Sequence, residues 1–224
     1  MLPNPCTVIR PNPHPGKGTV LVLGTPRGGT SVVAGICHML GIPMGLDIDR
    51  SNMEDLEFRR RRASATHGEM SDYFSRLREG RDIAGLKDPT IIDDLTNYWS
   101  LIPEPVLVVV SRDVYATAQR EEVSGVGFFD GLKEAIRRKY AILNFVHDVD
   151  APLIVVSYER LLQHPQAVVE GLGEFLVGEV GQDLVSLTTS LIRPHAKMPD
   201  EIDFVSARSR YAHDELSLGE GSAA

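Results

Sequence analysis

The chain has 224 residues, 42% of them hydrophobic and 24% charged, with a formal net charge of −8 at pH 7. These values are typical of one globular domain with a sizeable core, and the negative charge argues against a nucleic-acid-binding protein, whose footprint would be basic. No apolar run approaches the ~20 residues needed to span a bilayer, and the first 17 residues lack the apolar core of a signal peptide. We therefore expect a cytoplasmic protein without a membrane span.

The first segment of the chain is rich in proline, and the last segment is polar. Prolines at positions 3, 5, 11, 13 and 15 predict an extended arm over residues 1–18. From about residue 206 the chain becomes polar and ends in glycine and alanine, which predicts a loose tail over residues 206–224. One α/β domain over residues 19–205 is expected between them.

Between these ends, apolar runs of strand length alternate with helical patterns. This alternation predicts a central parallel sheet covered by helices on both faces, in which ligands bind beyond the carboxyl ends of the strands. One long helix is expected to bury an apolar stripe made of Leu132, Ile136, Tyr140, Leu143 and Val146. We expect strands at 19–23, 83–86, 106–110 and 153–156, and helices at 32–40, 53–78 with a break near 67–68, 91–99, 114–122, 165–176 and 181–191.

The connection between the first strand and the first helix is rich in glycine. Gly24 and Gly29 have the spacing of the phosphate-binding P-loop, G-x-x-x-x-G-K-[ST], and Ser31 stands at its hydroxyl position. Such a loop directs backbone N–H groups and a helix N-terminus at a phosphate or sulfate. Thr30 occupies the lysine position, which argues against ATP or GTP hydrolysis, and Arg27 supplies a cation within the loop instead. A tight turn without a ligand would need neither adjacent glycines nor an arginine.

Three cations each follow a different predicted strand. Arg27, Lys87 and Arg112 should therefore meet at one rim of the sheet and form a pocket for a polyanion. Taken singly, each is explained by an ordinary surface ion pair, so the prediction depends on their coincidence with the glycine-rich loop. No pair of cysteines or histidines has the spacing of a zinc site. We expect no metal, because these side chains already supply positive charge.

Several motifs resemble those of sulfotransferases that use 3′-phosphoadenylyl sulfate (PAPS). The family's 5′-phosphosulfate loop is matched by Pro26-Arg27-Gly28-Gly29-Thr30-Ser31, and a Lys-Asp-Pro-Arg element of bacterial members by Lys87-Asp88-Pro89. The 3′-phosphate strand with its arginine is matched by Val108-Val109-Val110-Ser111-Arg112-Asp113. A Tyr-Glu-Asp-Leu-Leu region with its following helix is matched by Ser157-Tyr158-Glu159-Arg160-Leu161-Leu162 with His164-Pro165 and Gly173-Glu174-Phe175-Leu176. Together the motifs cover roughly residues 19–178.

The resemblance implies a three-layer α/β/α fold like that of P-loop NTPases, and transfer of a sulfuryl group from PAPS to a hydroxyl or amine by in-line displacement. It implies that Arg112 binds the 3′-phosphate and that Arg27 and Lys87 offset charge on the leaving phosphate. PAPS would be a co-substrate, no metal would be required, and the acceptor would be a small molecule or a glycan. The 5′-phosphosulfate would be bound by Arg27, Gly28, Gly29, Thr30 and Ser31.

The chain departs from the family's pattern at two positions. The family usually has a serine eight residues after the 3′-phosphate arginine, where this chain has Arg120. Arg120 could still bind phosphate, or it could point to solvent. Many eukaryotic members have a catalytic histidine two residues after the lysine that matches Lys87, where this chain has Pro89. The resemblance therefore implies that the catalytic base lies elsewhere.

Glu54 is the best candidate for that base. In relatives that act on glycans a glutamate after the first helix is the base, and Asn52-Met53-Glu54-Asp55-Leu56-Glu57-Phe58 resembles that segment. A positioned carboxylate can take the proton that an attacking hydroxyl loses. The alternative is that Glu54 is a first-turn carboxylate favoured by the helix dipole. Asp55, Asp47 and His67 are weaker candidates, and the four arginines at positions 59–62 are expected to form a solvated stretch.

Two other functions are compatible with the sequence. A P-loop kinase or NTPase with a displaced lysine would use the same loop, although no clear acidic metal ligand follows a strand. A non-catalytic relative would bind the nucleotide without turnover. Acceptor choice would depend on the variable loops 44–80 and 123–131, whose composition is not typical of any one acceptor class.

Overall fold

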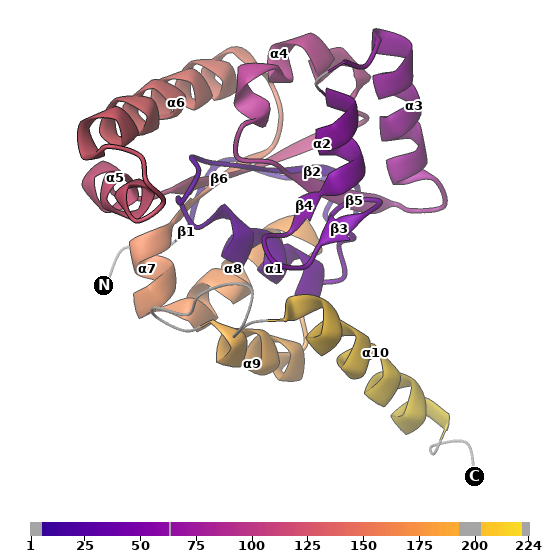
Figure 1. Ribbon diagram of the computed structural model, residues 1–224. Helices are drawn as coiled ribbons and strands as arrows, with labels where there is room; N and C mark the ends of the chain where they lie inside the picture. Colours follow the sequence, from indigo (N-terminus) through magenta and orange to yellow (C-terminus); the bar gives the residue numbers. More distant parts are fainter. Residues whose placement is uncertain (1–5, 63, 193–202, 221–224) are drawn as a thin grey trace.

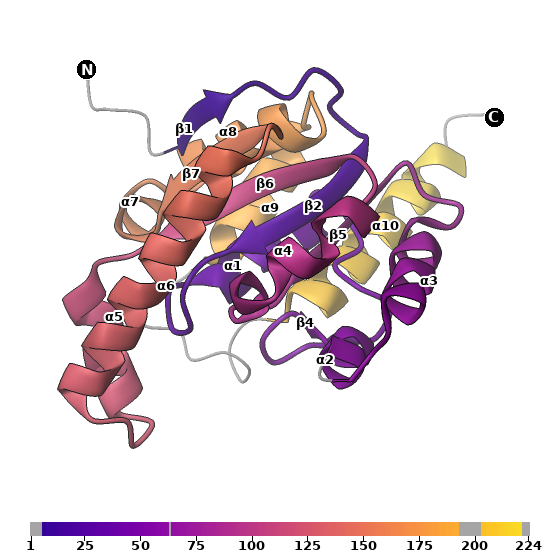
Figure 2. The same cartoon turned by 90° about the horizontal axis from the view of Figure 1, so that it is seen from above.

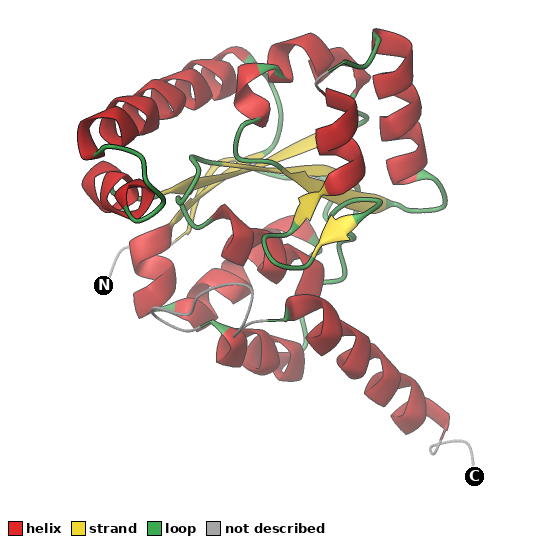
Figure 3. Cartoon of the chain, viewed as in Figure 1, coloured by secondary structure: helices red, strands yellow, loops and turns green. Residues whose placement is uncertain are grey.

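The computed structural model describes residues 6–62, 64–192 and 203–220, which form a central sheet between two layers of helices (Figures 1 and 3). The sheet has five strands in the order β1-β7-β6-β2-β5. A separate two-stranded hairpin, β3 and β4, lies beside its β5 edge. The strands are β1 (Cys6–Arg10), β2 (Gly18–Leu23), β3 (Ile48–Asp49), β4 (Glu54–Asp55), β5 (Ile83–Lys87), β6 (Pro105–Ser111) and β7 (Leu153–Ser157).

The helices divide between the two faces of the sheet. In Figure 1 α1, α7, α8, α9 and α10 lie below it, and α2, α3, α4 and α6 lie above it. The helix α5 packs against α6 and forms a helical hairpin with it, as Figure 2 shows from above. The helices are α1 (Thr30–Met39), α2 (Leu56–Arg62), α3 (His67–Arg78), α4 (Leu95–Tyr98), α5 (Val114–Glu122), α6 (Phe128–Asp148), α7 (Tyr158–Gln163), α8 (Pro165–Leu176), α9 (Gln182–Leu191) and α10 (Phe204–Glu220), with short 3-10 turns at Ile91–Asp93 and Trp99–Leu101.

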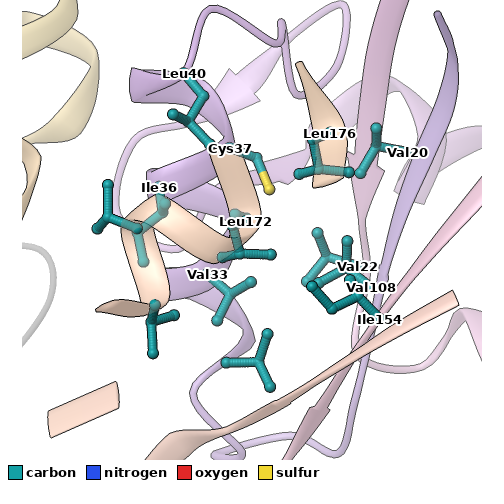
Figure 4. Packing of buried hydrophobic residues seen from close by; sticks show 14 of the residues in the cluster. Val20, Val22, Val33, Ile36, Cys37, Leu40, Val108, Ile154, Leu172 and Leu176 are labelled. Carbon is teal, nitrogen blue, oxygen red and sulfur yellow. The ribbon is translucent and has the colours of Figure 1, made fainter. Parts of the chain in front are cut away.

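The strands bury both faces, as a covered parallel sheet requires. Successive side chains of a strand point to opposite faces, so Val20 and Val22 of β2 contribute to one core cluster and Leu21 and Leu23 to the other. Figure 4 shows the first cluster, in which residues of α1 and α8 pack against the sheet. The second cluster lies under α3, α4 and α6. The predicted three-layer α/β fold is confirmed.

One strand makes the sheet mixed rather than wholly parallel. The strands β2, β5, β6 and β7 are parallel to one another, but β1 pairs antiparallel with β7. Residues 6–10 were expected to belong to an extended arm and instead form the edge of the sheet. The described prolines of this segment, Pro11, Pro13 and Pro15, follow β1, where they cost no ladder hydrogen bond. Arg10 holds the strand in place by donating hydrogen bonds to the carbonyls of Ala151 and Val146, at 2.6 and 3.0 Å.

The helix expected at 53–78 is three elements. Glu54 and Asp55 form β4, α2 follows, and α3 begins at His67. The side-chain oxygen of Asn52 accepts a hydrogen bond from the Glu54 amide across a turn, at 2.9 Å. The start of α3 is set by Thr66, which forms a capping box with Glu69.

The apolar stripe predicted for the long helix was largely wrong. Ile136, Tyr140 and Leu143 are 51%, 65% and 61% exposed. α6 instead buries a face that includes Ile142 and Phe145. Both faces of this helix carry apolar residues at helical spacing, so periodicity alone could not choose between them.

Most of the predicted loose tail is helical. α10 spans Phe204–Glu220, and its first turns pack against α1 through Phe204 and Ala207. A Cβ added at Gly35 would lie 2.2 Å from the Phe204 ring, so glycine is required for this close approach. Within the described ranges no helix combines the length and hydropathy needed to cross a bilayer.

Candidate active site

The glycine-rich loop follows the central strand of the sheet. β2 has β5 on one side and β6 on the other, so the chain crosses from one side of β2 to the other between β5 and β6. Parallel sheets bind ligands at such a point, because the connections on either side leave a crevice beyond the strand ends. The three cations expected at this rim, Arg27, Lys87 and Arg112, all follow or end these strands.

The backbone of the loop is held in a conformation that glycine permits. Gly29 has φ 89°, and a Cβ there would lie 2.1 Å from the ring of Tyr158. Arg27 also has a positive φ, of 56°, and its carbonyl accepts a hydrogen bond from the Arg112 guanidinium at 2.6 Å. Gly29 is the N-cap of α1 and supplies no side-chain cap, which leaves the first amides of the helix for an anion.

Lys87 connects the loop to the β3–β4 hairpin. Its side chain is only 1% exposed. The ammonium donates hydrogen bonds to Ser31 Oγ at 3.2 Å, to the Asn52 carbonyl at 3.0 Å and to Glu54 Oε1 at 2.8 Å. Burial lowers the pKa of Lys87 from its ordinary value, although the neighbouring Glu54 carboxylate opposes this shift. A buried ammonium needs partners of this kind because it has lost its hydration.

Glu54 lies between two cations. Its second carboxylate oxygen pairs with Arg59 at 2.9 Å, and its side chain is 12% exposed. Arg59 is half exposed, as expected for the arginine run, and also lines the site. Arg62 departs from that expectation, because its side chain is only 20% exposed. The β3–β4 hairpin turns Glu54 toward the loop, which a continuous helix would not have done. The other three arginines also form ion pairs, namely Arg60 with Asp47, Arg61 with Glu57, and Arg62 with Asp88 and Asp94.

The other proposed bases are placed differently. Asp55 is buried and accepts hydrogen bonds from the Tyr73 hydroxyl and the Phe58 amide, both at 2.9 Å, and from the Leu46 amide. Asp47 pairs with an arginine of α2 at 2.6 Å, and the exposed His67 begins α3. Asp55 therefore holds the hairpin against α2 and α3.

Arg112 extends from the end of β6 across the loop. Its guanidinium lies 4.9 Å above the ring centroid of Tyr158. The backbone carbonyl of Arg112 accepts a hydrogen bond from the Lys139 ammonium. Tyr158 supports both Gly29 and Arg112, a role that sequence analysis missed because the tyrosine was noted only as part of a motif. Arg120 lies on the exposed surface of α5 and does not line the loop cavity.

A cavity of about 450 Å³ brings the loop, the hairpin and the end of β5 together. We call it the loop cavity. Its lining includes three cations, Arg27, Arg59 and Lys87, and two carboxylates, Glu54 and Glu121. Of the cations, Lys87 and Arg59 pair with Glu54. Such a site can bind a polyanion and place a proton acceptor next to it. Within the part of the chain that the structure describes, no cluster of three or more His, Cys, Asp or Glu side chains is arranged to hold a metal. The lining residues are Pro26, Arg27, Gly29, Thr30, Ser31, Asn52, Glu54, Arg59, Lys87, Pro89 and Glu121.

No family model and no curated protein matches the chain in sequence. Among solved structures it resembles the sulfotransferase domain of the Synechococcus PCC 7002 olefin synthase, with 14% identity, 91% of this chain and 98% of that chain covered, and a TM-score of 0.51. It also matches sulfotransferase STF9 from Mycobacterium avium, with 14% identity, 92% and 77% coverage and a TM-score of 0.49. A third match is retinol dehydratase in complex with androsterone and inactive cofactor PAP, with 12% identity, 91% and 78% coverage and a TM-score of 0.48. The chain therefore has a sulfotransferase-like α/β fold.

Proposed function

We propose that this chain is a sulfotransferase that transfers a sulfuryl group from PAPS to a hydroxyl or amine of a small molecule or glycan. The observation that carries the proposal is the placement of Lys87, whose buried ammonium contacts both Ser31 of the loop and Glu54. The Lys87 ammonium, which suits the leaving phosphate, is thus in direct contact with the Glu54 carboxylate, which suits the proton of the acceptor. The shared fold supports the proposal.

The donor groups of the site fit a 5′-phosphosulfate. The amides at the start of α1, the Ser31 hydroxyl, Arg27 and Lys87 are hydrogen-bond donors around the loop cavity. Arg27 uses part of its guanidinium to hold Ser124 Oγ at 2.7 Å, and its other N–H groups remain for an anion. Arg112, fixed over Tyr158 at the end of the neighbouring strand, fits the 3′-phosphate. Whether Arg120 assists it stays a prediction.

PAPS supplies an activated sulfuryl group when bound, and this chain's residues would control charge and the proton. Lys87 and Arg27 would stabilise negative charge on the leaving phosphate. Glu54 would accept the proton of the attacking hydroxyl. Both of its oxygens already accept a bond from a cation, but each carboxylate oxygen can accept a second hydrogen bond.

The alternative of a magnesium-dependent kinase or NTPase is disfavoured by the same lysine. In a P-loop the serine or threonine hydroxyl binds Mg²⁺. Here the ammonium of Lys87 lies 3.2 Å from that hydroxyl, on Ser31, where a second cation would be repelled. A non-catalytic relative would have the same nucleotide site, and a turnover assay separates it from the enzyme.

Ligand-induced stabilisation tests the proposal. Adenosine 3′,5′-bisphosphate should raise the melting temperature without added metal, since ligand at a hundredfold excess over its dissociation constant stabilises the folded state by about 2.7 kcal/mol. Arg112→Ala should weaken this nucleotide roughly tenfold or more and leave adenosine 5′-monophosphate nearly unaffected. A larger shift from ATP with magnesium would overturn the proposal, as would equal losses for both nucleotides.

A further inference from the structure

A second cavity of about 230 Å³ adjoins the loop cavity. We call it the hairpin cavity, because it lies between the loop and the α5–α6 helical hairpin. Pro26 and Glu121 line both cavities, so the two are neighbours. Val126 and Ala135 give the hairpin cavity an apolar wall. A cavity of about 150 Å³ can hold benzene, so this one has room for a single ring.

Glu121 is the unbalanced charge of this second cavity. Glu134 and Arg138, which also line it, pair with each other at 2.9 Å, and Arg138 also pairs with Asp93 at 3.3 Å. In contrast, no described residue forms a hydrogen bond or ion pair with the Glu121 carboxylate. The Cβ of Glu121 packs closely against α6, because a Cβ added at Gly131 would lie only 3.1 Å from it.

The two cavities therefore differ in charge. The loop cavity has three cations and suits the polyanionic donor, whereas Glu121 would repel that donor's phosphates from the hairpin cavity. A partly buried carboxylate without a partner favours a ligand that brings a cation to it. The apolar wall beside Glu121 favours a ligand with a small apolar body.

We propose that the acceptor is a small hydroxylated amine, whose apolar body occupies the hairpin cavity, whose ammonium group pairs with Glu121, and whose hydroxyl faces the loop cavity. This inference rests on the proposed function. Glu121 acts in it as a specificity residue, and Glu54 and Lys87 keep their separate roles in the chemical step.

Three phenols that differ mainly in charge test this inference. Tyramine is a cation, 4-ethylphenol is neutral and 3-(4-hydroxyphenyl)propionate is an anion, and all three have one ring. We expect tyramine to bind the wild-type protein about tenfold more tightly than 4-ethylphenol, the scale of one charge-assisted hydrogen bond, and the propionate to bind most weakly. Affinities are measured by titration calorimetry with and without adenosine 3′,5′-bisphosphate.

The matched variants are Glu121→Gln and Glu122→Gln. Glu122 is the exposed neighbour and does not line either cavity. Glu121→Gln should remove the preference for tyramine, and Glu122→Gln should retain it; melting curves confirm that both variants fold.

The inference is overturned if wild-type protein fails to bind tyramine, if it binds the three phenols equally, or if the preference survives in Glu121→Gln. Failure of adenosine 3′,5′-bisphosphate to bind would instead overturn the proposed sulfotransferase function. The titrations without nucleotide would then still decide whether Glu121 selects a cation.

Discussion

At the scale of single residues, Lys87 and Glu54 carry the proposed chemistry. Lys87 contacts the loop, the hairpin backbone and the Glu54 carboxylate, and Glu54 is further held by Arg59. These contacts fix the carboxylate before any substrate binds, so little reorganisation is needed at the moment of reaction. They also mean that the two residues must be tested separately.

Glu54→Gln should bind nucleotide nearly normally and lose turnover by roughly a hundredfold or more, since the amide keeps the shape but cannot accept a proton. Its melting temperature should also fall, because Lys87 loses its counter-charge. Sulfuryl transfer is measured at saturating PAPS and below the melting range, with Glu122→Gln as the control. Near-normal turnover would leave Glu54 only the task of holding Lys87 and Arg59.

The kcat/KM for PAPS should fall as the pH is raised, and the fall should begin below pH 10.5, the ordinary pKa of lysine. Burial lowers the pKa of Lys87, so the ammonium that we propose stabilises the leaving phosphate loses its proton at a lower pH than an exposed lysine does. The effect on stability has the opposite sign. Lys87 binds its proton more tightly in the unfolded chain than in the folded protein. The free energy of unfolding therefore rises with pH between the lowered pKa of Lys87 and 10.5.

The check is a pH profile of kcat/KM for wild type and Lys87→Arg. The guanidinium stays charged throughout this range, so whatever activity the variant retains should not show the alkaline fall. An identical fall in both proteins would assign it to another group.

At the scale of elements, the β3–β4 hairpin decides where Glu54 lies. Its anchor is the buried Asp55, which accepts hydrogen bonds from the Tyr73 hydroxyl and the Phe58 amide. Burial, with Asp55 beside it, raises the pKa of Tyr73, so this hydroxyl stays protonated and donates. One carboxylate thus joins the hairpin to both α2 and α3.

Asp55→Ala should lower the free energy of unfolding by about 3 kcal/mol or more, because it leaves buried donors without an acceptor. Turnover should also fall, since Glu54 is the preceding residue in β4. Asp47→Ala is the control: it breaks a half-exposed ion pair with Arg60 and should cost less than about 1 kcal/mol. Urea unfolding measures both, and similar losses would contradict the anchoring role.

At the scale of the whole molecule, β1 pairs with β7 and becomes the edge strand of the sheet in its place. Without it, β7 would expose a row of unpaired backbone groups, which invites association with other chains. Arg10 connects this strand to the carbonyls of Val146, near the end of α6, and Ala151, before β7.

Arg10→Ala should therefore lower the free energy of unfolding by about 1–3 kcal/mol, because two carbonyls lose charge-assisted bonds. Lys17→Ala, at an exposed position of the same segment, should be nearly neutral. Chemical denaturation with light scattering measures stability and association together. An unchanged unfolding midpoint for Arg10→Ala would show that β1 is held by its ladder alone.

The sequence by itself determined the strand, loop and helix around the candidate anion site. The apolar run of β2, the glycine spacing and the start of α1 are neighbours in the chain, so local propensity and periodicity suffice. β6 and β7 were equally clear, because four or five consecutive apolar residues in a short run indicate a buried strand. The rule that parallel strands end at one edge then predicted that Arg27, Lys87 and Arg112 lie near one another. Arg27 and Lys87 line the loop cavity, whereas Arg112 does not line it and instead contacts the Arg27 carbonyl.

Only the tertiary structure decided which side chains meet at that edge. Lys87 and Ser31 are 56 positions apart in the chain, and Lys87 and Glu54 are 33 apart, so no local pattern predicts their contacts. The turn of the β3–β4 hairpin, the buried face of α6 and the docking of β1 and α10 depend on competition between alternative packings. The packing that buries the most apolar surface is favoured, and that surface comes from several segments of the chain. The periodic pattern of one segment therefore does not predict it.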